Sequence, residues 1–539
     1  MRKKITLLIS VLIMVLMFAG CASTSNEQQE TAAVEHHITI LHTNDHHGHP
    51  VAFYNYPAAG QGGLPAQATL VEQIRAEVPN VLLLSAGDMN TGRPESNFFK
   101  AEPDVIGMNY IGYDAMAMGN HEFDPTPEEM QRQIVLCEFP WLCANVVKED
   151  SGDYIDNVKP YIIKEYDGFK VAVFGLMTQT TESTGSPEHI KGYKFLDEVE
   201  TANKLVPELK EQADIVIALV HCGIYDDVTK GSERIAAQVP GLALVVDGHS
   251  HTKVKEPIMV TNEETGKQVA VVQAKDWGLY MGRVDLSFLN GEVTDLKYQL
   301  IPINVKYQEK LDDGTKVYHF EGEELKEDEG LLALLQPYVD KVDSVLKEAI
   351  GTATAPFLND NTRAEETAIG DLVADSLKWF AEQQGQEVDF AFQNGGGIRT
   401  SIADGEIQKQ TVYEVLPFDN SVAVCTLKGS TVIEMFNATP ANIGHGAMAQ
   451  VSKGVSLTIN SADGTVEELL INGSPVDPDA EYKVATNSYL AAGGDGYKMF
   501  NDKVDYYDTS LMQRDALIEY IISMGGTISP EVEGRITIK

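Results

Sequence analysis

The 539-residue chain has few basic residues for its length. Its 41 lysines and arginines are outnumbered by 80 aspartates and glutamates, which gives a formal net charge of −39. A surface of that sign repels polyanions, so the composition argues against binding to long nucleic acid. A small phosphate ester is still compatible with it, because a bound metal ion can reverse the local field. By itself the acidity indicates no more than solubility or a salty habitat.

Long apolar runs are absent after residue 20, so no later segment is expected to span a membrane. At the start, Arg2–Lys4 precede the apolar run Ile5–Phe18, and Cys21 follows two small residues. This order predicts a bacterial export signal over residues 1–20. Cys21 stands where a lipobox places its lipidated cysteine. We therefore expect an extracytoplasmic protein of the cell envelope, anchored to the membrane by a lipid on Cys21 through a flexible tether over 21–36; a plain secretory signal is the alternative.

Cysteine is scarce, with four residues beyond the export signal. Export permits disulfides, and Cys137 and Cys143 are close enough in sequence to pair. Two buried thiols are the alternative, and the sequence leaves both open. Cys222 follows His221 at a predicted strand end, where neighbouring side chains point in opposite directions, so we expect Cys222 to pack in the core.

The length excludes one ordinary domain, and a hydrophobic content of 43% can fill sizeable cores. From residue 38 to about 300, apolar runs alternate with helical stretches such as Gly63–Glu77 and Pro103–Ile111. This predicts an α/β fold with its functional loops on one rim. Residues 285–306 alternate in polarity around Asn290-Gly291, which predicts a hairpin, whereas the charged residues 308–330 predict a loop.

A second domain is predicted beyond an amphipathic stretch, Leu331–Ile350, whose helical spacing indicates a bridging helix. Short apolar runs then mix with helical patterns at 369–384 and near 508–524, and the chain ends in a predicted strand, GRITIK. We expect a catalytic domain over 37–330, a bridging segment over 331–355 and a mixed α+β domain over 356–539.

Polar clusters of Asp, Asn and His end five short apolar runs. A lone His after a strand is usually a polar cap or turn residue, so one such cluster would be uninformative. Five in order are typical of buried strands that deliver metal ligands to one rim of a sheet, and they predict a metal-dependent hydrolase. The runs with their clusters are 38–48, 80–88, 113–124, 214–223 and 242–251.

The candidate ligands are carboxylates, imidazoles and one amide, which favour Zn, Mn, Fe or Co over a structural thiolate site. Their number exceeds what one ion needs, so we expect two ions about 3.5–4 Å apart, bridged by one carboxylate. His42, His46 and His49 are weaker candidates. The candidate ligands are Asp45, His47, Asp88, Asn120, His121, Asp124, His221, His249 and His251.

The motifs around these residues carry a resemblance to a known family. D-x-H at 45–47, G-D at 87–88, G-N-H-E at 119–122 and G-H-x-H at 248–251 resemble the calcineurin-like metallophosphoesterases. The longer strings ILHTNDHHGH, GNHEFD, QNGGGIR and GGDGY are similar to the secreted 5′-nucleotidases, from about residue 37 to the C-terminus. The resemblance implies an α/β fold with a four-layer N-terminal domain, in which helices sandwich β-sheets, and a bridging helix to a mixed α+β nucleotidase domain.

The resemblance also assigns the ligands. Asp45, His47, Asp88 and His251 would hold one divalent cation, with Zn, Mn or Co as candidates. Asp88, Asn120, His221 and His249 would hold the second, with Asp88 as the bridge. The nucleotidases generally have Gln or Asn where this chain has His251, whereas the wider phosphoesterase family often has His there.

His121 and Asp124 resemble the catalytic pair of the family. A phosphoryl centre that gains negative charge needs a cationic donor nearby, and a carboxylate can hold an imidazole protonated and oriented. A water bound to the metals is acidified enough to attack phosphorus near neutral pH without a covalent intermediate.

The second domain would bind the nucleoside. Phe418 and Tyr489 resemble the aromatic pair that sandwiches the base, with Tyr489 at a position where the family usually has Phe. Stacking on an aromatic face tolerates any base. Asp495 resembles the ribose-binding carboxylate. Three more residues resemble the family's phosphate contacts: Arg363, Asn394 and Arg399. Some members carry a further Arg at the position where this chain has Asn359.

The resemblance therefore implies a two-metal phosphohydrolase that converts AMP, other nucleoside monophosphates, ATP and ADP to nucleosides and phosphate. UDP-sugars and NAD are further candidate substrates, and we expect a monomer. A cyclic-nucleotide phosphodiesterase or sulfur-ester hydrolase of the same fold is an alternative that the aromatic pair and GGDGY disfavour. A non-catalytic lipoprotein that binds nucleosides or metal is another, and the His121–Asp124 pair disfavours it.

Overall fold

A computed structural model describes residues 34–539, apart from 56, 185–188, 226, 312–313 and 419. The predicted export signal, Cys21 and most of the predicted tether lie outside the described residues. Residues His36–Lys539 form one compact unit. Among the residues that the structure describes, no helix combines the length and apolar character needed to cross a bilayer.

The first sheet of the main unit has the strand order β16-β15-β1-β4-β5-β6. Its parallel part is built from the strands that precede the first three ligand clusters: β1 (His36–Thr43), β4 (Val81–Ser85) and β5 (Ala115–Ala117), followed by β6 (Trp141–Leu142). The predicted hairpin is confirmed as β15 (Tyr280–Leu289) and β16 (Glu292–Pro302). Asn290 and Gly291 both have positive φ, 52° and 79°, as a tight two-residue turn requires.

The second sheet has the order β13-β14-β12-β11-β9-β8. Its centre is parallel and consists of β9 (Phe169–Met177), β11 (Ile215–His221), β12 (Leu244–Val246) and β14 (Gln268–Val272). The edges are antiparallel, with β8 (Tyr161–Tyr166) on one side and β13 (Ile258–Thr261) on the other.

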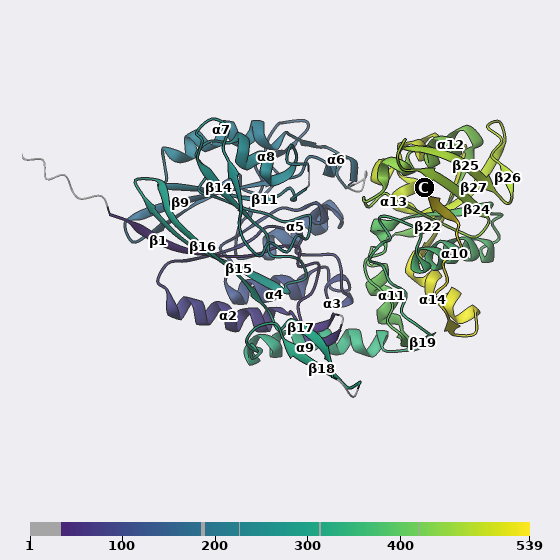
Figure 1. Cartoon of the computed structure of the whole chain (residues 1–539), viewed down its shortest axis with the longest axis horizontal. Helices are drawn as coiled ribbons and strands as arrows, with labels where there is room; N and C mark the ends of the chain where they lie inside the picture. The colour runs from purple at the N-terminus through teal and green to yellow at the C-terminus, as the bar shows by residue number, and fades with distance from the viewer. Residues whose placement is uncertain (1–33, 56, 185–188, 226, 312–313, 419) are drawn as a thin grey trace, which may run out of the picture. The chain divides into compact units, whose positions relative to one another are not determined.

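The two sheets pack face to face between two layers of helices, which confirms the four-layer prediction. Alternate side chains of β1 show why: Ile38 and Ile40 lie in the core between the sheets, whereas Leu41 packs with residues of α2 (Leu64–Glu77) and α4 (Glu102–Ile111). The second sheet is covered by α7 (Glu198–Lys210) and α8 (Gly231–Gln238). Figure 1 shows these helix pairs on opposite sides of the strands.

The bridging helix is α9 (Glu329–Leu346), shorter than predicted at its C-terminal end. The Asp328 carboxylate accepts the Leu331 backbone N–H at 2.7 Å and so caps the first turn. Residues 349–353 pair as strand β19 (Ala349–Ala353) instead of continuing the helix. The predicted loop at 308–330 was wrong in part, because β17 (Lys306–Lys310) and β18 (Lys316–Phe320) form a hairpin.

The second domain has a mixed five-stranded sheet of order β23-β20-β27-β22-β28. Its strands are β20 (Phe390–Asn394), β22 (Ser421–Lys428), β23 (Ala449–Val451), β27 (Glu481–Asn487) and β28 (Asp505–Met512). The first predicted helix is confirmed as α10 (Ala368–Gln383). The second, α14 (Gln513–Ser523), begins later than predicted, because residues 505–512 form the edge strand β28 (Asp505–Met512). The predicted final strand is confirmed as β30 (Ile536–Ile538), in a four-stranded sheet with β24 (Val455–Asn460), β25 (Thr465–Ile471) and β26 (Ser474–Pro475).

The four cysteines within the described chain are free thiols, which decides between the two alternatives for Cys137 and Cys143. The Trp141 indole N–H donates to Cys137 Sγ at 3.3 Å, and Cys143 is buried in the core. Cys222 is buried beneath α7 and α8, so its predicted role in packing is confirmed.

Candidate active site

The loops that follow the parallel strands meet at one rim, and the backbone there is unusual. Five of the seven predicted ligands have left-handed φ angles, a region that few residues other than glycine adopt. Such strain persists only when the surrounding structure holds it, and it is commonest at functional sites. The angles are 51° at Asp45, 46° at His47, 54° at Asp88, 77° at His249 and 54° at His251.

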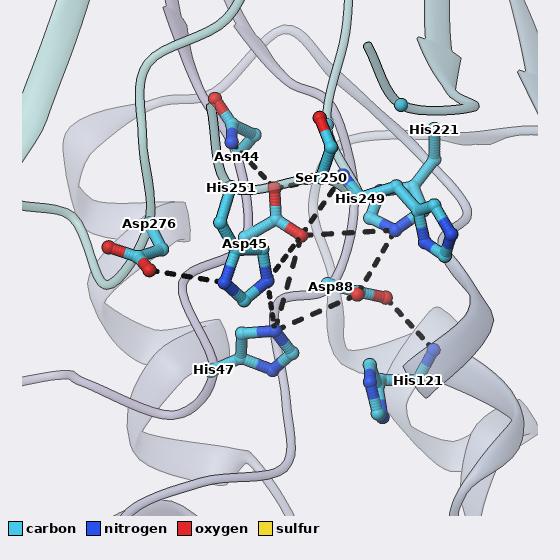
Figure 2. Close-up of polar contacts among 12 residues, drawn as sticks. Asn44, Asp45, His47, Asp88, His121, His221, His249, Ser250, His251 and Asp276 are labelled. Atoms are coloured by element: carbon cyan, nitrogen blue, oxygen red, sulfur yellow. Dashed lines mark hydrogen bonds and ion pairs between the residues drawn. The ribbon is translucent and has the colours of Figure 1, made fainter. Parts of the chain in front are cut away.

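One group of donors consists of Asp45, His47 and His251, whose ligand atoms lie within 4.8 Å of one another. His251 Nε2 is 3.3 Å from Asp45 Oδ1 and 3.2 Å from His47 Nε2. His47 Nε2 is also 3.7 Å from Asp88 Oδ2, so Asp88 adjoins this group (Figure 2). His47 and His251 are 204 positions apart in the sequence, yet the donor atoms face a common point.

A second group forms on the other side of Asp88. His221 Nε2 lies 3.0 Å from Asp88 Oδ2, and Asp45, Asp88 and His221 also fall within 4.8 Å of one another. Asn120 Oδ1 is 3.2 Å from His221 Nε2 and 2.7 Å from His249 Nδ1. Asp88 therefore adjoins both groups.

The imidazoles are held in defined orientations by oxygen atoms behind them. His47 Nδ1 lies 3.1 Å from the Thr91 carbonyl oxygen, and His221 Nδ1 lies 2.7 Å from that of Ala86. An oxygen partner at Nδ1 keeps the proton there and leaves the Nε2 lone pair free for a metal. The donor set of carboxylates, imidazoles and an amide thus fits divalent transition-metal ions.

Neighbouring charges in this cluster shift one another's pKa values. Burial alone would raise the pKa of Asp88, but the imidazoles of His221 and His121 outweigh it and hold that pKa well below its usual range. Burial alone would lower the pKa of His221, but the carboxylates of Asp88 and Asp45 outweigh this effect and raise the pKa to about 10. Cations that bind here must displace protons from the imidazoles.

Glu122 organises the cluster and was not singled out from the sequence. Its buried carboxylate accepts the backbone N–H groups of Asp88, Met89 and Gly119, at 2.9, 2.9 and 2.6 Å. A Cβ on Gly119 would lie 2.2 Å from Asp88 Oδ1, so only glycine fits there. The G-N-H-E string contained this signal, because a carboxylate next to predicted ligands can also bind the loop that carries them.

The predicted catalytic pair is joined by a hydrogen bond. His121 lies in the short helix η1 (Asn120–Phe123), and its Nδ1 is 2.7 Å from Asp124 Oδ2. Burial lowers the pKa of His121, but the carboxylates of Asp124 and Asp88 outweigh it and raise that pKa above its usual value. The imidazole can therefore be a cation near neutral pH with Nε2 available.

Residues of the second domain reach this pair. The Phe418 ring stacks on the His121 imidazole, with a centroid distance of 5.8 Å and an interplanar angle of 22°. Arg399 Nη2 lies 3.5 Å from His47 Nε2, and its guanidinium is 5.8 Å from the Phe418 centroid. A guanidinium and an aromatic ring thus adjoin the donor groups.

Asp495 is the centre of a second network. Its Oδ1 accepts the Tyr489 hydroxyl at 2.9 Å and its Oδ2 accepts the Asn394 amide at 2.7 Å. Asn394, expected as a phosphate contact, therefore holds the carboxylate expected at the ribose. The Arg363 residue is exposed overall, but burial around its guanidinium and the nearby charge of Arg399 lower its pKa to about 10.

The remaining candidates stand apart from the donor groups. His46 Nε2 bonds with the Gln67 amide at 3.1 Å, and His49 Nδ1 lies 2.8 Å from the His46 carbonyl oxygen. His42 is buried between the sheets without a hydrogen-bond partner among the residues described. Asn359, at the position where some members carry Arg, accepts the Ser401 hydroxyl at 2.9 Å.

Comparison with known proteins agrees with this arrangement. Two family models match the chain: calcineurin-like phosphoesterase over residues 38–253 and the C-terminal domain of 5′-nucleotidase over residues 349–502. The 5′-nucleotidase of Vibrio cholerae serotype O1 is 37% identical over 530 residues, which cover 93% of each chain. Protein UshA of Escherichia coli strain K12 is 36% identical over 516 residues, 90% of each.

A solved structure shows the same architecture over nearly the whole chain. The 5′-nucleotidase precursor from Thermus thermophilus has a TM-score of 0.81 at 28% identity, and the match covers 93% of this chain and 99% of that one. Calcineurin-like phosphoesterases use a dinuclear metal centre, which agrees with the two donor groups that adjoin Asp88. The chain is therefore a nucleotide phosphohydrolase and belongs to the 5′-nucleotidase family of calcineurin-like metallophosphoesterases.

Proposed function

We propose that the protein is an extracytoplasmic 5′-nucleotidase that hydrolyses AMP and other nucleoside monophosphates, and also ATP and ADP, to nucleosides and phosphate. The observation that carries the proposal is the convergence of two metal-donor groups beside the His121–Asp124 pair, with Arg399 and Phe418 of the second domain adjoining them. UDP-sugars and NAD are second candidates, because their phosphate bonds could enter the same site.

The donor groups would hold two divalent cations, with Zn, Mn or Co as candidates. Asp45, His47 and His251 would bind one, Asn120, His221 and His249 the other, and Asp88 both. When bound, such ions neutralise charge on the phosphate and lower the pKa of a coordinated water.

The side chains around the cations would direct the substrate. Nδ1 of His121 is committed to Asp124, so Nε2 is the atom that would donate a proton toward the departing ester oxygen. The planar guanidinium of Arg399 matches phosphate oxygens, and Arg363 would extend this positive region.

The second domain would select nucleosides. The ring faces of Phe418 and Tyr489 would stack on the base, which is worth about 1–3 kcal/mol per base and tolerates different bases. Asp495, oriented by Asn394 and Tyr489, would accept hydrogen bonds from ribose hydroxyls. Together these contacts favour nucleotides over simple phosphate esters.

Phosphate release from AMP, ATP, UDP-glucose, NAD and a cyclic nucleotide, before and after chelation and metal add-back, tests the proposal. We expect AMP hydrolysis to disappear on chelation and to return with added metal. Asp88→Asn should abolish it, whereas Asp150→Asn at an exposed turn should not. Full activity in chelated enzyme and in Asp88→Asn would refute the assignment. Preference for the cyclic nucleotide would favour a phosphodiesterase, and binding without hydrolysis a non-catalytic protein.

The location is proposed from the N-terminal pattern. The export signal over 1–20 and Cys21 would place the enzyme in the cell envelope, anchored by lipid. Mass spectrometry of the mature N-terminus should find a diacylated or triacylated Cys21. An unmodified cysteine there, or cleavage at another residue, would contradict the lipid anchor without affecting the proposed activity.

A further inference from the structure

The loop between β14 and β15 is fastened to the loop that carries Asp45. Asn44 hydrogen-bonds the backbone of residues 274 and 275, at 2.7 and 2.5 Å, and the Trp277 backbone N–H donates to the Asp45 carbonyl at 2.7 Å. Lys275 and Trp277 both have left-handed φ, 66° and 56°. Asp276 lies between them, so its backbone is held in place relative to a predicted metal ligand.

The Asp276 carboxylate is buried, with 4% of the residue exposed, and uses one oxygen for all its polar contacts that are resolved. Oδ2 is 3.1 Å from His251 Nδ1 and 3.1 Å from Lys275 Nζ. Oδ1 has no hydrogen-bond partner within the described part of the chain. Burial of an incompletely satisfied carboxylate costs stability, so its presence calls for a compensating role.

The contact defines which nitrogen of His251 is free. A carboxylate at Nδ1 accepts the proton of that nitrogen, and the Nε2 lone pair then points at Asp45 Oδ1 and His47 Nε2, 3.3 and 3.2 Å away. Figure 2 shows Asp276 and Asp45 on opposite sides of the His251 ring. The imidazole is thus set between a buried carboxylate and the first donor group.

His47 and His221 have backbone carbonyl oxygens in the equivalent place, from Thr91 and Ala86. A carboxylate is a stronger acceptor than a carbonyl, so it makes the imidazole a better electron donor to a metal. Only His251 has this arrangement among these three imidazoles.

We propose that Asp276 is a positioning residue of the metal centre, which fixes the His251 tautomer and tightens the binding of the cation held with Asp45 and His47. The inference rests on the proposed two-cation centre. The family resemblance assigned no role to Asp276. Loss of its carboxylate should weaken the binding of one ion and not of the other.

The test is metal binding by the purified full chain, measured with Zn²⁺ and Mn²⁺ by elemental analysis after dialysis and by chelator competition. Wild type should bind two ions. Asp276→Ala should weaken one of them about 10- to 100-fold and leave the other unchanged, as loss of such partners typically does. Asp276→Asn keeps an acceptor oxygen and should recover part of the affinity. Lys275→Met removes the other charge beside Oδ2 and should leave both affinities unchanged.

A double-variant cycle separates positioning from general structural damage. If Asp276 acts through His251, Asp276→Ala should cost little further affinity in a His251→Gln background. Equal affinities in wild type and Asp276→Ala would overturn the inference, as would additive losses in the cycle or an effect of Lys275→Met equal to that of Asp276→Ala. If Asp276→Ala does not fold, Asp276→Asn decides by the same cycle. Wild type that binds no metal would instead overturn the proposed function.

Discussion

The Tyr489 hydroxyl donates to Asp495 Oδ1 at 2.9 Å and accepts the Asp495 backbone N–H at the same distance. Asp495 itself has a left-handed φ of 51°. One phenol oxygen therefore holds both the backbone and the side chain of the proposed ribose-binding residue, in a motif where the family usually has phenylalanine.

We predict that Tyr489→Phe raises KM for AMP at least about fivefold, because it removes both hydrogen bonds to Asp495, and the loss of even one such bond costs about 1 kcal/mol. The ring face for stacking remains, so kcat should change little. The measurement is steady-state kinetics with AMP and with p-nitrophenyl phosphate, which has no ribose. Tyr520→Phe, in the same domain and without a resolved hydroxyl bond, is the control. An equal rise in KM for both substrates would contradict a role at the ribose.

Gly494 determines where the Tyr489 ring can lie. A Cβ at this position would be 2.4 Å from Tyr489 Cζ, so Gly494→Ala must displace the ring. We expect weaker nucleotide binding with unchanged hydrolysis of p-nitrophenyl phosphate, measured as above. Gly496→Ala is the control for a change in the same loop, because the added Cβ has no atom within 4 Å, although the left-handed φ of 77° there adds backbone strain. If Gly496→Ala weakens nucleotide binding as much as Gly494→Ala does, disturbance of the loop and not displacement of the ring is responsible.

The His121–Asp124 pair makes a prediction about leaving groups. Asp124→Asn should lower kcat for AMP by roughly 10- to 100-fold, because an amide does not stabilise the protonated imidazole that would donate to the ester oxygen. p-Nitrophenolate needs no proton to depart, so kcat for p-nitrophenyl phosphate should fall much less. Metal content should be unchanged. A uniform loss with both substrates would show that Asp124 supports the fold of the site and not proton transfer.

Asp104 gives a prediction about stability and pH. It lies buried in the first turn of α4, neither carboxylate oxygen has a hydrogen-bond partner among the residues described, and burial raises its pKa from 3.8 to about 7. The folded state therefore favours the protonated acid, and stability is lost as the pH rises from about 4 to about 7.

The difference between the pKa values of Asp104 in the folded and unfolded states lowers the free energy of unfolding at high pH by at most about 4 kcal/mol. Asp104→Asn removes this contribution. Chemical denaturation should show the variant and wild type with similar stability near pH 4 and the variant more stable at pH 8. If the difference in stability between Asp104→Asn and wild type does not change with pH, the effect does not come from this carboxyl group.

Much of the active site could be predicted because it follows one rule. The carboxyl ends of parallel strands meet at one rim, so polar residues that directly follow buried strands must come together there. Asp45, Asp88 and His221 were found in this way, each at or just beyond the end of its strand. The hairpin at Asn290-Gly291 was equally accessible, because a local turn preference determined it.

Two segments differ from the prediction. Residues 308–330 look like a charged loop, yet β17 and β18 pair there, because exposed hairpins need little hydrophobic content. Residues 508–512 were predicted as the start of a helix, but pairing with β22 (Ser421–Lys428) makes them part of a strand. In this second case local preference was overridden by pairing with a distant part of the chain.

The sequence by itself determined the ligand types, their order along the chain and the rim at which they would lie, since strand direction and side-chain chemistry are local properties. Only the tertiary structure decided which oxygen stands behind each imidazole, that Glu122 binds the Asp88 loop, and that Tyr489 holds Asp495. These contacts depend on the packing of loops against one another, where a shift of a few ångströms makes or breaks a hydrogen bond.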